Sequence, residues 1–324
     1  MKNIVFRKFL FFLLFCMLTG IEMHAQNYVI QPVMMECDMS DYAQMKLEAR
    51  LTGILDFYGI SSTNNNSRIV IVSKIYITSN NIMRTNPPRV SKHMELVMTI
   101  GDIIDNYQFS TCRINLAGIG ENDAKAYISA FNSVNADNPT IKEMIATAKQ
   151  KINTYYSDNI DNIVKKAKML SLNSGGEEAL YMLTTIPNVN ETVMKKRDDT
   201  SCEILKHITA EASYTAFVNA KAQWTAEKGV ESAKKALGYL KEVNASSPNY
   251  KEALALWKEI ANKLESDEKE AAALVMREYE DSKKQYEDRM AFRQSILDAC
   301  VSIGTSFGNH QPQTVSKTIN KWGF

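Results

Sequence analysis

The sequence predicts an α+β protein with two parts: an N-terminal mixed β-sheet covered by helices, and an all-α region of helical hairpins that includes a long C-terminal helix. Two observations predict this. Runs of β-branched and alternating apolar residues occur before residue 157, and none follows it. Beyond that residue, apolar side chains recur only at helical spacing. We therefore predict an α/β domain at residues 26–156, an α-helical repeat-like domain at 157–303 and a flexible polar tail at 304–324.

Residues 1–25 have the pattern of a cleavable bacterial signal peptide. Basic residues precede an apolar run at residues 9–18, and a small residue, Ala25, ends a cleavage site. The run is about 10 residues, too short for a bilayer that needs roughly 20. A buried N-terminal helix is the alternative. We expect no lipid anchor at Cys16, because the bulky Phe15 precedes it where lipoprotein signals have a small residue.

The predicted location is therefore the periplasm or the extracellular space, after cleavage near Ala25. The whole chain carries a formal charge of +1. A nearly neutral chain offers no electrostatic reason to bind nucleic acid. No later segment is apolar over bilayer length, so we expect no transmembrane segment in the mature chain.

The first domain should begin with a strand at residues 28–37 and a helix that Asp41 caps and Gly59 ends. Residues 68–78 are almost continuously apolar, which is typical of a central strand covered on both faces. Alternation at residues 93–100 and 107–116 predicts two hairpin strands around the turn at Gly101.

Gly118-Ile119-Gly120 then leads into a helix. This pair of glycines resembles part of a dinucleotide-binding fingerprint, but the third glycine is missing. We favour a tight strand-to-helix turn in which glycine supplies positive φ. Pro139 should occupy the first turn of the next helix.

In the second region, Ser174-Gly175-Gly176 should separate two helices. A weak internal repeat follows, in which two apolar patterns each lead to a turn containing a proline; the patterns are Ala179, Leu180, Leu183, Ile186 and Ala236, Leu237, Leu240, Val243. Such units describe helical hairpins that bury a shared core. Residues 249–303 lack proline and glycine. They could form one helix of about 80 Å, or two helices that divide at the polar residues 265–270.

Chemistry-bearing residues are sparse and scattered. His93, His207 and His310 lie in separate segments, without neighbours at catalytic or metal-ligand spacing. The cysteines left after cleavage also lack metal-type spacing, and we expect no cofactor, metal or catalytic residue. Cys37 and Cys112 could pair in an oxidising compartment, whereas buried free thiols are an equal alternative.

Two resemblances can be named from these residues. The long early helix ending at residues 55–59, the strand 68–78, the hairpin around Gly101-Asp102 and the segment 117–124 are similar in order to an envelope family, which includes the curli-secretion lipoprotein and penicillin-binding-protein activators. Residues 233–254 resemble a tetratricopeptide hairpin. Both resemblances imply protein binding.

We therefore expect an exported, non-enzymatic cell-envelope protein that acts as a protein-binding scaffold or assembly accessory. Its partner would be another cell-envelope protein. The expected contact residues are Tyr239, Tyr250, Trp257 and Trp322, although each could be core, and for Trp257 core is favoured. The alternatives are a structural subunit of an outer-membrane assembly and an envelope hydrolase with an unrecognised site.

Overall fold

The computed structural model describes residues 28–35, 39–62, 67–226, 228–244, 247–265 and 293–309, together with Arg277, Glu280 and Trp322. The predicted signal peptide at residues 1–25, with Cys16, lies outside the described residues. So do Cys37 and His310.

A four-stranded sheet precedes a series of helices, as predicted. The strands are β1 (Gln31–Met34), β2 (Ile69–Met83), β3 (Arg89–Asp102) and β4 (Tyr107–Gly120). The helices are α2 (Asp41–Phe57), α3 (Asp123–Phe131), α4 (Pro139–Leu172), α5 (Gly176–Thr184), α6 (Glu191–Ala226), α7 (Val230–Leu240), α8 (Tyr250–Glu265) and α10 (Arg293–Asn309).

The strands lie in the order β1-β2-β3-β4, with β1 parallel to β2 and the other pairs antiparallel. Strand β1 pairs only with residues 70–73 of β2. Strands β2 and β3 run further than the apolar pattern predicts, to Met83 and from Arg89. The extension is exposed to solvent, so the hairpin pairing of β2 with β3 holds it in strand conformation where hydrophobic burial does not.

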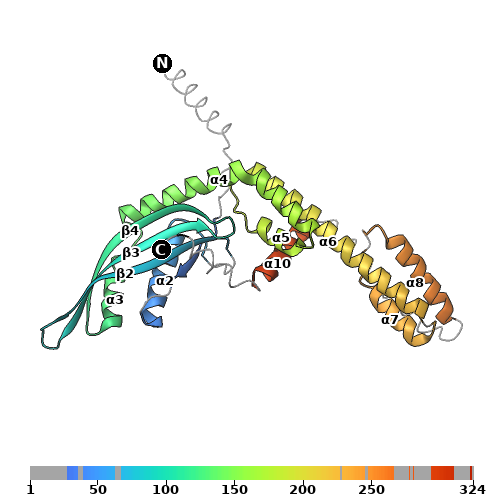
Figure 1. Cartoon of the computed structure of the whole chain (residues 1–324), viewed down its shortest axis with the longest axis horizontal. Helices are drawn as coiled ribbons and strands as arrows, with labels where there is room; N and C mark the ends of the chain where they lie inside the picture. Colours follow the sequence, from blue (N-terminus) through green and yellow to red (C-terminus); the bar gives the residue numbers. More distant parts are fainter. Residues whose placement is uncertain are drawn as a thin grey trace, which may run out of the picture.

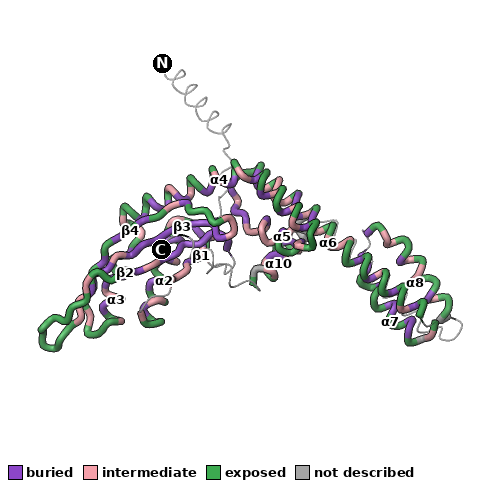
Figure 2. Tube along the Cα trace, viewed as in Figure 1, coloured by how far each residue is buried: buried purple, intermediate pink, exposed green. Residues whose placement is uncertain are grey.

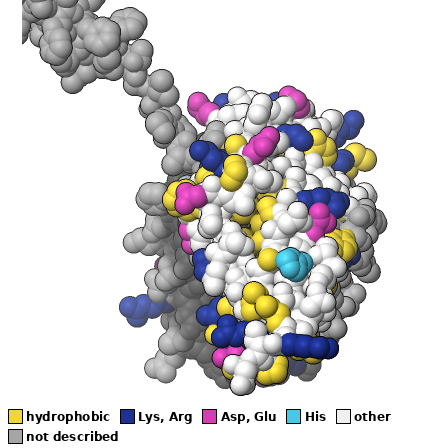
Figure 3. Space-filling model, turned by 90° about the vertical axis from the view of Figure 1, so that its left-hand side faces the viewer, with side chains coloured by type: hydrophobic (Ala, Val, Ile, Leu, Met, Phe, Trp, Pro, Cys, Tyr) yellow, Lys and Arg dark blue, Asp and Glu magenta, His cyan; other side chains and the backbone are white. Residues whose placement is uncertain are grey.

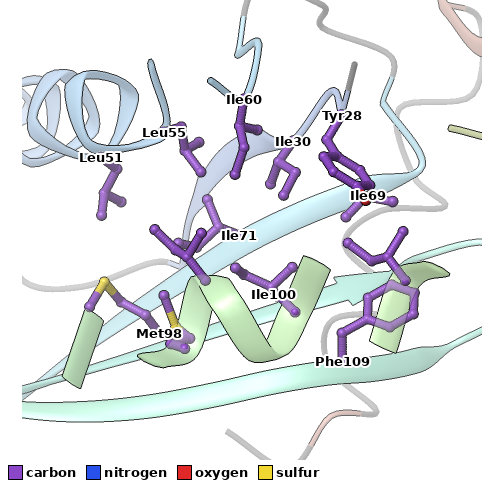
Figure 4. Packing of buried hydrophobic residues seen from close by; sticks show 14 of the residues in the cluster. Tyr28, Ile30, Leu51, Leu55, Ile60, Ile69, Ile71, Met98, Ile100 and Phe109 are labelled. Atoms are coloured by element: carbon purple, nitrogen blue, oxygen red, sulfur yellow. The ribbon is translucent and has the colours of Figure 1, made fainter. Parts of the chain in front are cut away.

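One face of the sheet packs against α2, α3 and α4. Alternate residues of β2, β3 and β4 join helix residues in one hydrophobic cluster, which Figure 4 shows in part, with Leu51 and Leu55 of α2 above Ile71, Met98 and Ile100. Alternation of side chains across a strand places these residues together. Asp41 lies in the first turn of α2, but Ser40 takes the cap position, so the predicted cap is wrong by one residue. Gly59 has φ of +69°, as predicted.

The glycines after the hairpin serve another purpose than predicted. Gly118 and Gly120 belong to β4, and neither has positive φ. A Cβ atom on Gly118 would lie 2.0 Å from the carbonyl oxygen of Ala126 in α3. The glycines therefore allow the backbone of α3 to approach the strand.

The predicted domain boundary at residues 156 and 157 falls inside α4, which runs unbroken through Tyr156. The first hydrophobic cluster continues across this point into α5, α6 and α10. A second cluster joins the C-terminal half of α6 with α7 and α8. The division between cores thus lies within α6. In Figure 1, α6 leads from the sheet and its helices to α7 and α8 at the opposite end.

The helical breaks follow the sequence in part. Pro139 begins α4, and Ser174, with φ of 64°, separates α4 from α5 as predicted. Helix α8 is described to Glu265 and α10 from Arg293, so whether residues 249–303 form one helix or two lies outside the described residues.

Residues 304–324 were predicted to be a flexible tail, and the structure differs from this at both parts that it describes, residues 304–309 and Trp322. Helix α10 continues through Gly304 to Asn309. Trp322 packs on the other face of the sheet with Val70, Val72 and Ile103. The composition of the tail concealed this contact, because a single aromatic residue anchors it.

Candidate protein-binding surfaces

The most exposed part of the sheet is the far end of the β2–β3 hairpin, residues 76–91, which we call the distal hairpin. Every residue from Tyr76 to Arg89 is exposed except Ser79. Figure 2 shows this end of the sheet in green, in contrast to the buried centre. Large apolar side chains are among the exposed residues: Tyr76, Ile77, Ile82 and Met83. Exposed apolar side chains that gather in one place mark interaction sites.

Two of these residues continue the core face of the sheet. Ile77 pairs with Met94 and Ile82 with Val90, and β3 keeps its alternation from Met94 to Val90. Ile77 and Ile82 therefore point to the same side as the buried Ile75. Ile77 is 44% exposed and Ile82 75% exposed. The apolar side chains on the core side of β2 therefore continue beyond the core, into the exposed end of the hairpin.

The outer edge of β2 is also open along this stretch. Strand β1 ends its pairing at Ser73, so among the described residues no strand lies beside Lys74–Met83 on that side. An edge of this kind presents unpaired backbone N–H and C=O groups that can accept another strand. In natural proteins, charged side chains that face the core, or prolines, normally prevent an edge strand from pairing with another chain. At these positions β2 has Ile77 and Ile82 instead.

Charge on the distal hairpin has one sign. Residues 74–94 include Lys74, Arg84 and Arg89 but no aspartate or glutamate. Lys92, at the base, is buried and forms an ion pair with Asp123 of α3 at 3.4 Å. Its ammonium group also lies 5.0 Å from the ring centroid of Tyr127. This pairing fixes the base of the hairpin to α3. Figure 3 views this end of the molecule, where hydrophobic side chains lie among both basic and acidic ones, the acidic ones belonging to residues outside 74–94.

The structure places three of the predicted contact residues in the helical hairpin α7–α8 but does not make them one surface. Trp257 is fully buried in the second cluster, and the partly buried Tyr250 packs against that cluster. Tyr239 is 38% exposed. Trp257 is therefore core, which leaves Tyr239 as the most accessible of the three. The four apolar positions of each predicted repeat are buried, one set in each cluster.

The buried charge cluster around Arg68 is the main polar feature that the sequence did not reveal. The guanidinium donates to Asp102 Oδ2 at 2.8 Å, to Asp105 Oδ2 at 2.8 Å and to the carbonyl oxygen of Met182 at 2.9 Å. The hydroxyl of Tyr156 donates to Asp102 at 2.6 Å. The cluster thus ties the sheet to α4 and α5.

The electrostatics of this cluster are those of a compensated structural site. Burial disfavours the charged guanidinium, but the Asp102 and Asp105 carboxylates outweigh this, so the pKa of Arg68 is raised. Burial also raises the pKa of the Tyr156 phenol well above its ordinary value. Asp102 Oδ1 accepts the backbone N–H groups of Ile104 and Asp105. The carboxylate therefore already has a partner on each oxygen.

The other sequence candidates are dispersed. Cys112 is a buried free thiol in the sheet core. Cys37, the other cysteine of the predicted pair, lies outside the described residues, so the pairing stays a prediction. His93 is exposed on β3, while His207 lies on α6 beside Glu211. In the part of the chain that the structure describes, no three His, Cys, Asp or Glu side chains gather as metal ligands would. None of the helices described there is long and apolar enough to cross a bilayer.

One pocket of about 210 Å³ lies where the α5–α6 loop meets α10 and the start of β2. Its charged residue is Arg197. That guanidinium donates to the carbonyl oxygen of Ile186 at 3.0 Å, to Asn188 Oδ1 at 2.8 Å and to Asp198 at 2.8 Å. Its charge is thus compensated within the fold, which makes the pocket a weak candidate for an anion site.

Comparison with known proteins adds little. No model of a protein family matches the chain, and no curated protein matches it in sequence. Among solved structures, a crystal structure of a minor lipoprotein from Acinetobacter baumannii is similar, with a TM-score of 0.24 and 10% identity. The similarity covers 39% of this chain and 94% of that chain. A likeness of this degree carries no argument about function, and both family resemblances stay predictions.

Proposed function

We propose that this is an exported, non-enzymatic accessory protein that binds another cell-envelope protein through the distal hairpin. The observation that carries the proposal is the open edge of β2 beside the exposed Ile77 and Ile82. Export rests on the signal-peptide pattern of residues 1–25.

The favoured mode of binding is strand addition. An extended segment of the partner would pair with β2 beyond Ser73, and its backbone would satisfy the open edge. Alternate side chains of that segment would then cover Ile77 and Ile82. Burial of apolar surface contributes about 25 cal/mol per Å², so these side chains supply affinity while the register supplies specificity.

Charge narrows the chemistry of the partner. Arg84 and Arg89 are exposed near the hairpin tip, and no acidic residue lies between residues 74 and 94. A partner segment with apolar residues and acidic flanks would fit this surface. Complementary charge mainly raises the rate of association and excludes partners of the wrong sign.

The test compares two equally exposed apolar residues. Ile82 on the hairpin and Leu172 at the end of α4 are 75% and 72% exposed. Ile82→Lys and Leu172→Lys would be expressed in the native host as the full tagged chain, and envelope proteins recovered with each would be compared with wild type.

We expect Ile82→Lys to lose at least one defined protein that both wild type and Leu172→Lys retain, with unchanged thermal unfolding. Recovery of the same proteins by all three chains would contradict the proposal. Binding of wild type, but not Ile82→Lys, to protein-free vesicles of anionic lipid would contradict it too and assign the hairpin to a membrane surface.

A further inference from the structure

On the outer face of the sheet, the side chain of Trp322 occupies a closely fitting site, which we call the seat. Trp322 is only 9% exposed, and it packs with Val70, Val72 and Ile103. These three residues come from β2 and from the turn after β3, far from residue 322 in sequence. The contact is therefore tertiary, and it covers apolar surface that would otherwise face solvent.

The seat admits the indole because Gly101 has no side chain. A Cβ atom on Gly101 would lie 2.4 Å from Cη2 and 2.8 Å from Cζ2 of Trp322. Contacts under 3.0 Å do not occur between such atoms, so a larger residue at 101 would displace the ring. The same Cβ atom would also lie 2.7 Å from the carbonyl oxygen of Tyr107, across the β3–β4 turn. A glycine inside a strand often marks such an approach by another group.

Polar contacts complete the recognition. Nε1 of Trp322 donates to Asn106 Oδ1 at 2.6 Å, and Nε2 of Gln108 donates to the carbonyl oxygen of Trp322 at 3.2 Å. The first bond requires an indole N–H group, and the second requires a backbone carbonyl oxygen at the same residue. Asn106 has φ of 52°, a conformation that asparagine tolerates and that fixes the turn.

We propose that this region, formed by Gly101, Asn106, Gln108 and the apolar residues beneath them, is a recognition site for a tryptophan-bearing peptide. The chain fills the site in cis with its own Trp322 segment. The same segment, supplied in trans, binds when Trp322 is removed. A tethered segment has a local concentration in the millimolar range, so it excludes a dilute external peptide from the wild-type chain.

The test uses the full chain and a labelled synthetic peptide of residues 315–324, with binding followed by fluorescence anisotropy. We expect the peptide to bind Trp322→Ala at least tenfold more tightly than wild type. A peptide with alanine in place of its tryptophan should not bind. Asn106→Gly, added to Trp322→Ala, keeps the positive φ but removes the acceptor and should weaken binding several-fold.

Two further variants distinguish a loss of peptide binding from a loss of folding. Trp322→Phe keeps a ring in the seat without the N–H donor, and peptide affinity should fall between those of wild type and Trp322→Ala. Gly101→Ala in the Trp322→Ala chain should abolish binding while its thermal unfolding stays close to that of Trp322→Ala. The second measurement is needed because the added Cβ would also lie 2.7 Å from the carbonyl oxygen of Tyr107. If a folded Trp322→Ala or Trp322→Phe chain binds the tryptophan and alanine peptides equally, or binds neither, the proposal is overturned. The outcome is independent of the distal hairpin, because Ile82 is not part of this site.

Discussion

At the residue scale, the side chain with the largest structural role is Arg68. It is fully buried between two carboxylates, a phenol and a backbone carbonyl. The sequence places an arginine at the start of an apolar strand and an aspartate at a hairpin turn, but only the register of β2 with β3 brings them together. The sequence pattern does not show which residues of the two strands pair, so this cluster could not be predicted.

Replacing Arg68 tests that role. Arg68→Met leaves the buried Asp102 without its cation and leaves Asp105 only the exposed Lys166, 3.7 Å away. Loss of one partner of a buried pair costs about 3–5 kcal/mol. Arg113→Met is the matched control, since Arg113 is 65% exposed in its ion pair with Glu95, and exposed pairs contribute about 1 kcal/mol or less. Urea unfolding of both variants gives the comparison; equal losses would contradict a structural role for Arg68.

Buried thiols and phenols predict the pH dependence of stability. Burial raises the pKa of Cys112 to about 11 and that of Cys300 to about 12, above the ordinary value for a thiol. It also raises the pKa of four tyrosines, the buried Tyr28 and Tyr156 and the partly buried Tyr155 and Tyr181.

Each of these groups loses its proton at a lower pH in the unfolded chain than in the folded one. The stability that they contribute is therefore complete below pH 9 and falls as the pH rises toward 12. We expect the free energy of unfolding to decrease over this interval, and Cys112→Ala to flatten the decrease between pH 9 and 11. Denaturant unfolding that is unchanged from pH 8 to 11 would refute this expectation.

At the scale of elements, the existence of strands and helices followed from apolar periodicity, whereas their ends did not. The predicted strand at residues 68–78 reaches Met83, because hairpin pairing extends it through polar residues. The predicted boundary at residue 156 lies within α4, because a 34-residue helix serves both the sheet and the helices after it. Pairing and packing between distant segments decide such ends.

Packing of α10 against α5 depends on Gly304. A Cβ atom there would lie 2.6 Å from Oγ1 of Thr184 and 3.0 Å from backbone atoms of Tyr181. We expect Gly304→Ala to destabilise the protein by about 1–3 kcal/mol through overpacking. Gly238 in α7 has no atom within 4 Å of the same position, so Gly238→Ala should stabilise by roughly 0.5–1 kcal/mol. Thermal unfolding measures both, and the same sign for both would contradict the packing account.

At the scale of the whole molecule, the α+β layout with its helical second part is as the sequence predicts, but the division of the cores is not. Two hydrophobic clusters share α6, and the distal hairpin and the α7–α8 hairpin lie at opposite ends (Figure 1). Of the predicted contact residues, Trp257 and Trp322 proved to be internal. A buried aromatic and a docking aromatic have the same local pattern, so the sequence could not separate them.

The sequence pattern, in contrast, does not indicate the distal hairpin, because the adjacent Pro87 and Pro88 predict an exposed loop that cannot continue a sheet. Exposure of Ile77 and Ile82 depends on the shortness of β1 and on the position of α3, whose first residue, Asp123, lies beside Lys92. These are properties of the assembled sheet. The surface on which the proposed function rests therefore emerges only from the whole fold.

Site-specific photo-cross-linking in cells tests this central claim most directly. A photoreactive amino acid would replace Ile82 in one chain and Leu172 in another. We predict one defined protein adduct from position 82 and none from position 172. Adducts of the same proteins at both positions, or none at position 82, would contradict the claim that the distal hairpin binds a partner.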